Sequence, residues 1–277
     1  MDKVLSFHQG TLPLLISMPH AGLNLTPAVR DGLVEPARSL PDTDWHIPRL
    51  YDFVREMGAS VVAAEYSRFV IDLNRPEDDQ PLYAGATTGL FPATLFDGEP
   101  LFKEGMVPSA AERAGYLENI WRPYHDTLRQ ELARLKAKFG YALLWDAHSI
   151  RSHVPHLFDG KLPDFNLGTF NGASCDPQLA ERLQAVCGEA HGYSHVLNGR
   201  FKGGTSPAIT ATRPTTSMRC NWSWRRALIW KRWSRSCIGK IWRSRPRWCC
   251  VGCWKRSWPG PKSGTANLWE RAHPRLR

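Results

Sequence analysis

The sequence predicts an α/β protein with a mixed, largely parallel central sheet and helices on both of its faces. Two observations lead to this fold class. Short apolar runs typical of buried strands alternate with stretches of helical periodicity, and strands that alternate with helices usually form a parallel sheet covered by those helices. The chain has 277 residues, enough to bury a sizeable core. In such sheets a ligand usually binds beyond the carboxyl ends of the strands.

Four apolar runs are expected to form strands. Residues 12–18 lead into a Pro-His-Ala-Gly loop, as a buried strand does where it enters a turn. Residues 61–64 and 69–73 are rich in β-branched and aromatic side chains, which predicts the next two strands. Residues 141–145 form the last run, and Asp146 follows directly at its end.

Two helices are expected between these strands. Residues 45–57 place apolar side chains at helical spacing and stop before Gly58, a common helix terminator. Residues 117–139 trace the apolar face of a long amphipathic helix that Gly140 closes. Pro123 lacks a backbone N–H, so it should kink this helix.

The basic charge of the chain is confined to its last part. The formal net charge of +10 alone would suggest an anionic partner such as nucleic acid. Residues 205–277 contain 17 of the 36 Lys and Arg residues but one of the 26 acidic residues, a net charge of +16, whereas residues 1–204 carry −6. We therefore expect an α/β enzyme domain over residues 1–204, followed by an unrelated tail. No secretory signal or membrane-spanning run is evident in the sequence, so a cytoplasmic location is expected.

The tail, residues 205–277, is interpreted as an out-of-frame translation without its own fold. With GC-rich codons, the segment from Arg219 to Arg225 is CGC TGC AAC TGG AGC TGG CGC. Read from the third base, the same DNA encodes Leu-Gln-Leu-Glu-Leu-Ala, an alternation typical of a strand. Two further stretches of the tail agree with this frame, so we expect a frameshift near Gly204. The alternative is a genuine basic extension that binds nucleic acid through charge and Trp stacking.

Two histidines and two aspartates could form a metal site at the strand ends. His20 follows the first strand, Asp42 and Asp44 lie at a helix start, and His148 follows the last strand. Imidazole and carboxylate groups suit zinc, and a catalytic zinc keeps three protein ligands and one open position. Each residue also has an ordinary explanation. A histidine at a strand end is often a hydrogen-bonded structural residue, and an aspartate is a favoured helix N-cap.

Several cationic side chains could bind or polarise an anionic substrate. Arg68 and Arg75 flank a short apolar run together with Asn74. Arginine offers a planar fork for carboxylates and can stabilise a developing oxyanion. The alternative is that both arginines form surface salt bridges with nearby carboxylates such as Asp72. Arg200 lies in a Gly-rich loop and could bind a dicarboxylate or be an ordinary solvated charge.

Taken together, the motifs resemble the N-formylglutamate amidohydrolase family. Their order and spacing match along essentially all of residues 1–204. The segments that carry the resemblance are Ser17-Met18-Pro19-His20-Ala21-Gly22, Asp42-Thr43-Asp44-Trp45-His46, the run from Ser67 to Arg75, Asp146-Ala147-His148-Ser149-Ile150, Leu157-Phe158-Asp159-Gly160 and Asn198-Gly199-Arg200-Phe201-Lys202-Gly203-Gly204.

The resemblance implies a phosphorylase/hydrolase-like, zinc-carboxypeptidase-like fold and the hydrolysis of N-formyl-L-glutamate to formate and L-glutamate by a metal-activated water. It also implies a place as the last step of one route of histidine degradation. His20 and His148 match the metal-binding histidines. The acidic ligand is expected to be Asp44, with Asp42 as the alternative. The expected cofactor is a divalent metal, zinc in the first place.

The resemblance also implies roles for the polar residues near the metal. Asn74 and Arg75 resemble the pair that grips the substrate carboxylate, with Arg200 as a further substrate-binding candidate, and Arg68 resembles the arginine that polarises the scissile carbonyl. In related enzymes the general base is a glutamate on a late strand. Here that glutamate appears only in the shifted frame, so the chain as written is expected to be inactive or poorly folded. A metallo-amidohydrolase for another N-acyl amino acid is the alternative.

Overall fold

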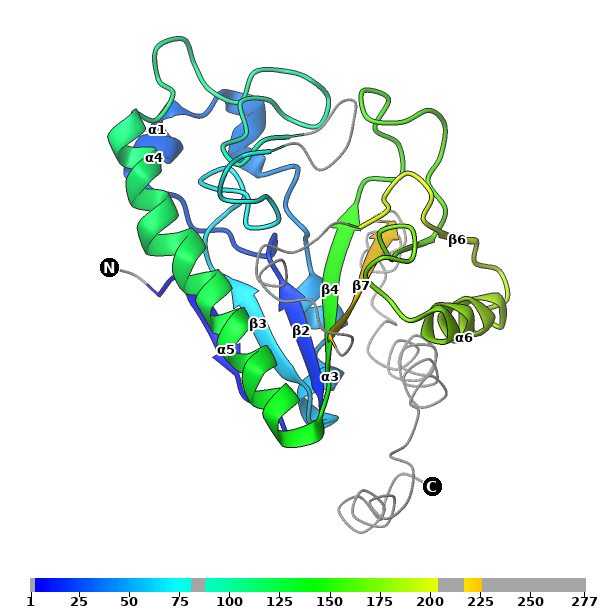
Figure 1. Ribbon diagram of the computed structural model, residues 1–277. Helices are drawn as coiled ribbons and strands as arrows, with labels where there is room; N and C mark the ends of the chain where they lie inside the picture. The colour runs from blue at the N-terminus through cyan, green and yellow to red at the C-terminus, as the bar shows by residue number, and fades with distance from the viewer. Residues whose placement is uncertain (1–2, 81–87, 204–216, 226–277) are drawn as a thin grey trace.

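The computed structural model describes residues 3–80 and 88–203, and the backbone of residues 217–225 (Figure 1). These residues form one seven-stranded sheet of order β1-β3-β2-β4-β7-β5-β6. The strands are β1 (Leu5–His8), β2 (Leu14–Met18), β3 (Ser60–Ala64), β4 (Ala142–Ile150), β5 (Phe165–Gly168), β6 (His195–Leu197) and β7 (Ser217–Arg225).

The sheet is mixed and largely parallel, as expected. Strands β3, β2, β4 and β7 run parallel to one another in its centre. Strand β1 is antiparallel to β3 at one edge, and β5 is antiparallel to β7 near the other. The carboxyl ends of the four central strands therefore meet at a single edge of the sheet.

The helices are short apart from those on either side of the sheet centre. The described helical segments are α1 (Pro27–Gly32), the 3₁₀ turn η1 (Glu35–Ser39), α2 (Ile47–Leu50), α3 (Phe53–Glu56), α4 (Ala110–Tyr116), the π-helical turn η2 (Leu117–Trp121), α5 (Arg122–Phe139) and α6 (Pro177–Gly188). Helices α4 and α5 follow each other through η2 as one long rod along the sheet (Figure 1).

Both faces of the sheet are covered by helices. Within β2, Leu15 packs into a cluster with α5 side chains such as Leu128. Its neighbour Ile16 points to the opposite face and packs with α3 side chains such as Phe53, together with Leu183 of α6. The alternation of one strand between two apolar clusters confirms the predicted three-layer arrangement. A fully buried leucine or isoleucine contributes roughly 1.5–3 kcal/mol to such a core.

Two predicted elements are confirmed with changed bounds. The predicted helix over 45–57 divides into α2 and α3. The helix over 117–139 ends at Gly140, whose left-handed φ of 80° suits glycine. Pro123 was expected to kink this helix. In the structure the proline lies in the first turn of α5, where a missing backbone N–H is tolerated, and the π-helical turn η2 directly precedes α5.

The prediction of a strand over residues 69–73 was wrong. The segment is buried but irregular. Ser67 accepts a hydrogen bond on its carbonyl from the backbone N–H of Val70, and one on its hydroxyl from the N–H of Phe69. These turn contacts take the place of a strand ladder, although Phe69 and Ile71 are as buried as strand residues. A continuous apolar run reports burial and cannot by itself distinguish a strand from a buried turn.

Strand β4 is longer than expected. It continues past residue 145 to Ile150, so Asp146 and His148 lie inside the strand instead of following it. Strand β7, inside the predicted tail, pairs with β4 over its whole length. The rest of the tail lies outside the described residues. Among the described helices, none is both long and apolar enough to cross a membrane.

Candidate metal centre

The carboxyl edge of the central strands brings together three residues that the sequence singled out. His20 lies two residues beyond the end of β2, and His148 lies on the neighbouring strand β4. Asp44 comes from the loop between η1 and α2, and its backbone N–H donates to the carbonyl of His20 at 2.9 Å. This bond fixes the aspartate loop against the histidine loop.

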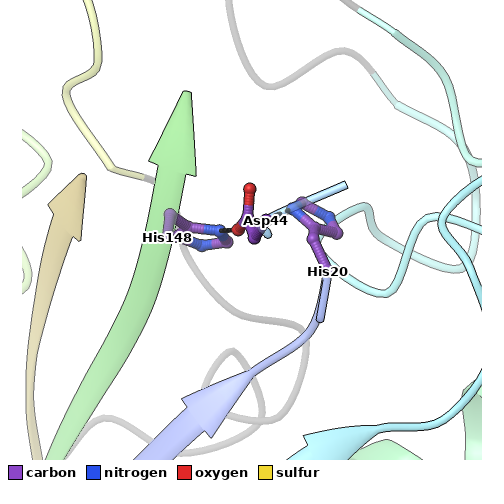
Figure 2. Close-up of side chains that lie close together, drawn as sticks. All are labelled: His20, Asp44 and His148. Atoms are coloured by element: carbon purple, nitrogen blue, oxygen red, sulfur yellow. Dashed lines mark hydrogen bonds and ion pairs between the residues drawn. The ribbon is translucent and has the colours of Figure 1, made fainter. Parts of the chain in front are cut away.

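The three side chains point toward one another, with the Asp44 carboxylate between the two imidazoles (Figure 2). Oδ2 of Asp44 lies 3.0 Å from Nδ1 of His148 and 3.7 Å from Nδ1 of His20. One ligand atom from each residue lies within 4.8 Å of the others. His20 and Asp44 are buried and His148 is nearly so. Two imidazoles and one carboxylate in this arrangement could hold a metal ion.

The outer nitrogen of each imidazole has its own partner. Nε2 of His20 lies 2.7 Å from Oδ1 of Asp72. Nε2 of His148 lies 3.3 Å from the amide nitrogen of Asn74 and 3.6 Å from Oδ2 of Asp146. Both histidines therefore turn Nδ1 toward Asp44 and Nε2 toward a second polar group. Metal-binding histidines in proteins are commonly held in this way.

Contacts within the cluster favour the charged forms of Asp44 and His148, although burial opposes them. Burial would raise the pKa of Asp44, but hydrogen bonds with His148 and His20 hold that pKa below its ordinary range. Burial would lower the pKa of His148, but the carboxylates of Asp146 and Asp44 raise it to about 9. Negative charge thus dominates around the imidazoles, as a cation site requires.

Asp42 lies outside this cluster. Its Oδ2 accepts from the backbone N–H of Phe96 at 2.9 Å, and its Oδ1 accepts from Arg151 at 3.2 Å. The side chain is almost fully buried. The geometry therefore favours Asp44 over Asp42 as a metal ligand, and Asp42 ties two loops together.

The two predicted arginines converge beside the cluster. Arg68 donates to Oδ2 of Asp72 at 2.6 Å and to the hydroxyl of Thr88 at 3.2 Å, with its guanidinium 4.5 Å from the ring centre of Phe96. Arg75 donates to the same Thr88 hydroxyl at 3.1 Å and to the Thr88 carbonyl at 2.5 Å. The Arg68–Asp72 salt bridge that sequence reasoning placed at the surface is real but buried.

Two other predicted site residues, Asn74 and Arg200, are not members of the three-residue cluster. The side chain of Asn74 lies against His148, and its backbone N–H donates to Asp72. Arg200 donates from Nε to the carbonyl of Leu157 at 2.7 Å. The substrate-binding roles of these residues remain predictions. Sequence reasoning considered Asp72 as an arginine partner and missed its contact with His20, because only folding brings the two loops together.

Comparison with known proteins agrees with the resemblance. The family model described as N-formylglutamate amidohydrolase matches residues 12–220. A curated N-formylglutamate deformylase from Pseudomonas putida is 85% identical over 204 residues, which are 74% of this chain and 76% of that protein. A curated N-formylglutamate deformylase from Pseudomonas aeruginosa is 74% identical over 204 residues, which are 74% of this chain and 77% of that protein.

Solved structures agree with the fold. The crystal structure of N-formylglutamate amidohydrolase from Ralstonia eutropha superposes with a TM-score of 0.74 at 22% identity, covering 91% of this chain and 98% of that one. A protein from Agrobacterium tumefaciens superposes with a TM-score of 0.66 at 16% identity, covering 91% and 96%. With the family match and the two relatives, these findings show that the chain belongs to the N-formylglutamate amidohydrolase family.

Proposed function

We propose that this protein is a hydrolase of a linear amide bond that converts N-formyl-L-glutamate to formate and L-glutamate. One structural observation carries the proposal. A buried His-Asp-His cluster and two buried or half-buried arginines meet at the carboxyl edge of a parallel sheet. The names of the two curated relatives supply the substrate. The proposed setting is the last step of a histidine degradation route in the cytoplasm.

The donor set fits a divalent metal, zinc first, held by His20, Asp44 and His148. Neutral imidazoles and a carboxylate are common zinc ligands, and three protein ligands leave a position for water. When bound, zinc lowers the pKa of such a water and polarises a carbonyl. Sequence and geometry both favour this set, because the three ligand atoms lie within 4.8 Å of one another.

The arginines provide the cationic part of the site. In our proposal Arg68 donates to the formyl oxygen as negative charge develops on it during attack at the formyl carbon. Arg75, with Asn74 and Arg200, binds a carboxylate of the substrate. The burial of Arg68 strengthens its interaction with an oxyanion, because little water competes for the guanidinium. The salt bridge to Asp72 also holds Arg68 in place before substrate arrives.

A general base must take the proton of the attacking water and return it to the leaving amine. In our proposal this base is encoded in the shifted frame. The Glu codon of Leu-Gln-Leu-Glu-Leu-Ala overlaps the codons of Trp222 and Ser223. The backbone of Ser223 pairs with that of His148, and paired residues on neighbouring strands share one face of a sheet. A glutamate encoded there would lie beside the metal cluster.

Two further observations support a frameshift near Gly204. The two curated relatives match over 204 residues each, the length of the segment that precedes the tail. Residues 205–277 contain 17 basic residues and one acidic residue, a composition unlike that of residues 1–204. We therefore propose that residues 1–204 are the amidohydrolase domain, and that the tail as written leaves the enzyme with little or no turnover.

Resequencing the DNA across codons 203–206, followed by a formate-release assay, tests both proposals. One base gained or lost, with turnover of N-formyl-L-glutamate by the restored chain, supports them. An unchanged sequence removes the frameshift. Turnover that survives complete removal of metal by a chelator refutes the metal assignment. A panel of other N-acyl amino acids shows whether the enzyme turns over the formyl group, the smallest acyl group in the panel, faster than larger acyl groups. Faster turnover of a larger acyl group would identify an amidohydrolase with another substrate.

A further inference from the structure

Asp72 is a buried carboxylate on which three donors converge. Its side chain is fully buried. Oδ1 lies 2.7 Å from Nε2 of His20 and accepts from the backbone N–H of Asn74 at 2.9 Å. Oδ2 accepts from Arg68 at 2.6 Å.

A metal-binding histidine needs a lone pair on the nitrogen that faces the metal, and the partner of the other nitrogen decides which tautomer is present. Nδ1 of His20 faces Asp44, and Nε2 faces Asp72. We propose that Asp72 is a positioning residue that keeps the proton of His20 on Nε2 and, through its second oxygen, holds Arg68 next to the metal cluster. The inference rests on the proposed metal site and extends it.

The division of the two oxygens explains why a carboxylate is needed here. An asparagine has one acceptor oxygen and one amino group of two donors. Turned either way, an asparagine at position 72 would direct its amino group at Nε2–H of His20 or at the guanidinium of Arg68. One of the two contacts would become a donor facing a donor in a buried place, which is costly.

Stability alone is a weak reason for this ion pair. A buried salt bridge gains little net free energy over apolar residues of the same size, because both charges must be desolvated. Asp72 lies in an irregular segment that neither helix nor strand geometry holds. The contact that distinguishes Asp72 from an ordinary buried ion pair is the one with His20.

Zinc affinity of the full chain tests the proposal. We would titrate Zn²⁺ into the wild type, Asp72→Asn and Glu131→Gln in competition with a chromophoric chelator. Glu131 is also buried and accepts from Arg134 and Ser60, but at the amino end of β3. Asp72→Asn should weaken zinc binding by about 10- to 100-fold, the usual effect of removing such a partner. Glu131→Gln should bind zinc like the wild type. Wild-type affinity in Asp72→Asn would overturn the proposal.

A second measurement does not depend on the folding of a variant. In the zinc-loaded wild type, long-range ¹H–¹⁵N correlation spectra report which ring nitrogen of His20 carries the proton. The expected result is a proton on Nε2, and a proton on Nδ1 would overturn the proposal. Arg68→Met keeps the His20–Asp72 contact and should therefore bind zinc with wild-type affinity, and in a chain with a restored reading frame it should lose turnover.

The outcomes separate this inference from the proposed function. Weaker zinc binding by Asp72→Asn, together with no formate release by a chain with a restored reading frame, would support the role of Asp72 and refute the deformylase reaction. Wild-type zinc binding by Asp72→Asn, together with formate release by the restored chain, would refute the role of Asp72 and support the deformylase reaction. The same measurements apply unchanged to a chain with a restored reading frame, because every residue involved precedes the tail.

Discussion

Nδ1 of His148 lies 3.0 Å from Oδ2 of Asp44, and each residue has a second polar contact, through the imidazole of His148 and through the backbone N–H of Asp44. The loop of Asp44 is held by the carbonyl of His20, and the imidazole of His148 by Asn74. The contact therefore joins two separately anchored elements. Such an arrangement suits a site that must hold its ligands ready before a metal binds.

Asp44→Asn should abolish tight zinc binding, because the asparagine removes the negative charge that lies between the two imidazoles. We expect a loss greater than the roughly 10- to 100-fold effect of an outer partner, measured by competition with a chelator. Asp42→Asn is the matched control, since Asp42 is equally buried but is bound to Phe96 and Arg151. Loss of zinc in Asp42→Asn with retention in Asp44→Asn would reverse the assignment of the acidic ligand.

Arg68→Met and Arg75→Met should differ in steady-state kinetics. Arg68 is proposed to act on the oxyanion, so its loss should lower kcat by about 10²- to 10³-fold, as removal of one oxyanion donor does. Arg75 is proposed to bind the substrate carboxylate, so its loss should mainly raise KM. The assay is formate release by the chain with a restored reading frame. Equal effects on kcat in both variants would contradict the division of roles.

The sequence predicted those parts of the fold that have a clear apolar pattern and a marked end. Helix α5 was found because apolar residues recur at helical spacing and Gly140 marks its end, and strand β2 because a continuous apolar run leads into a loop. The segment 69–73 was mistaken for a strand, since its burial is strand-like and its turn depends on hydrogen bonds to Ser67. Helix α6 was not predicted, although Asp176 before a proline is a common start signal.

The site was predictable as a set of residue types and not as a set of contacts. His20 and His148 were found from the predicted strand ends and from the family resemblance, although His148 lies inside β4. The choice between Asp42 and Asp44 could not be made, because both precede α2 and only the folded loop turns Asp44 toward the imidazoles. The role of Asp72 was hidden for the same reason, since 52 residues separate it from His20.

Tyr141→Phe should change the stability of the protein at high pH. Burial raises the pKa of Tyr141 from its ordinary value of 10 to about 12. Because folding favours the protonated phenol, its contribution to stability is complete below pH 10 and is lost as the pH rises toward 12. Urea unfolding should show that the wild type loses more free energy of unfolding over this interval than Tyr141→Phe does. Parallel losses in the two proteins would contradict the shift.

Gly22→Ala should weaken both the fold and the metal site. The loop that carries His20 runs so close to the end of β3 that a Cβ at Gly22 would lie 2.2 Å from the carbonyl oxygen of Tyr66. The neighbouring N–H groups of Leu23 and Asn24 bond to the carbonyl of Glu65, so the loop cannot move away without breaking them. We expect a loss of about 1–3 kcal/mol, as for other overpacked sites, and weaker zinc binding because His20 shifts.

The matched control for Gly22 is Gly115, inside helix α4. A Cβ there would meet no atom closer than 4.0 Å, and replacing a helical glycine with alanine usually stabilises by about 0.5–1 kcal/mol. Thermal unfolding should therefore move in opposite directions for the two variants, and only Gly22→Ala should bind zinc less tightly. If Gly22→Ala lost stability while zinc affinity stayed at the wild-type value, the loop would matter for folding without setting the position of His20.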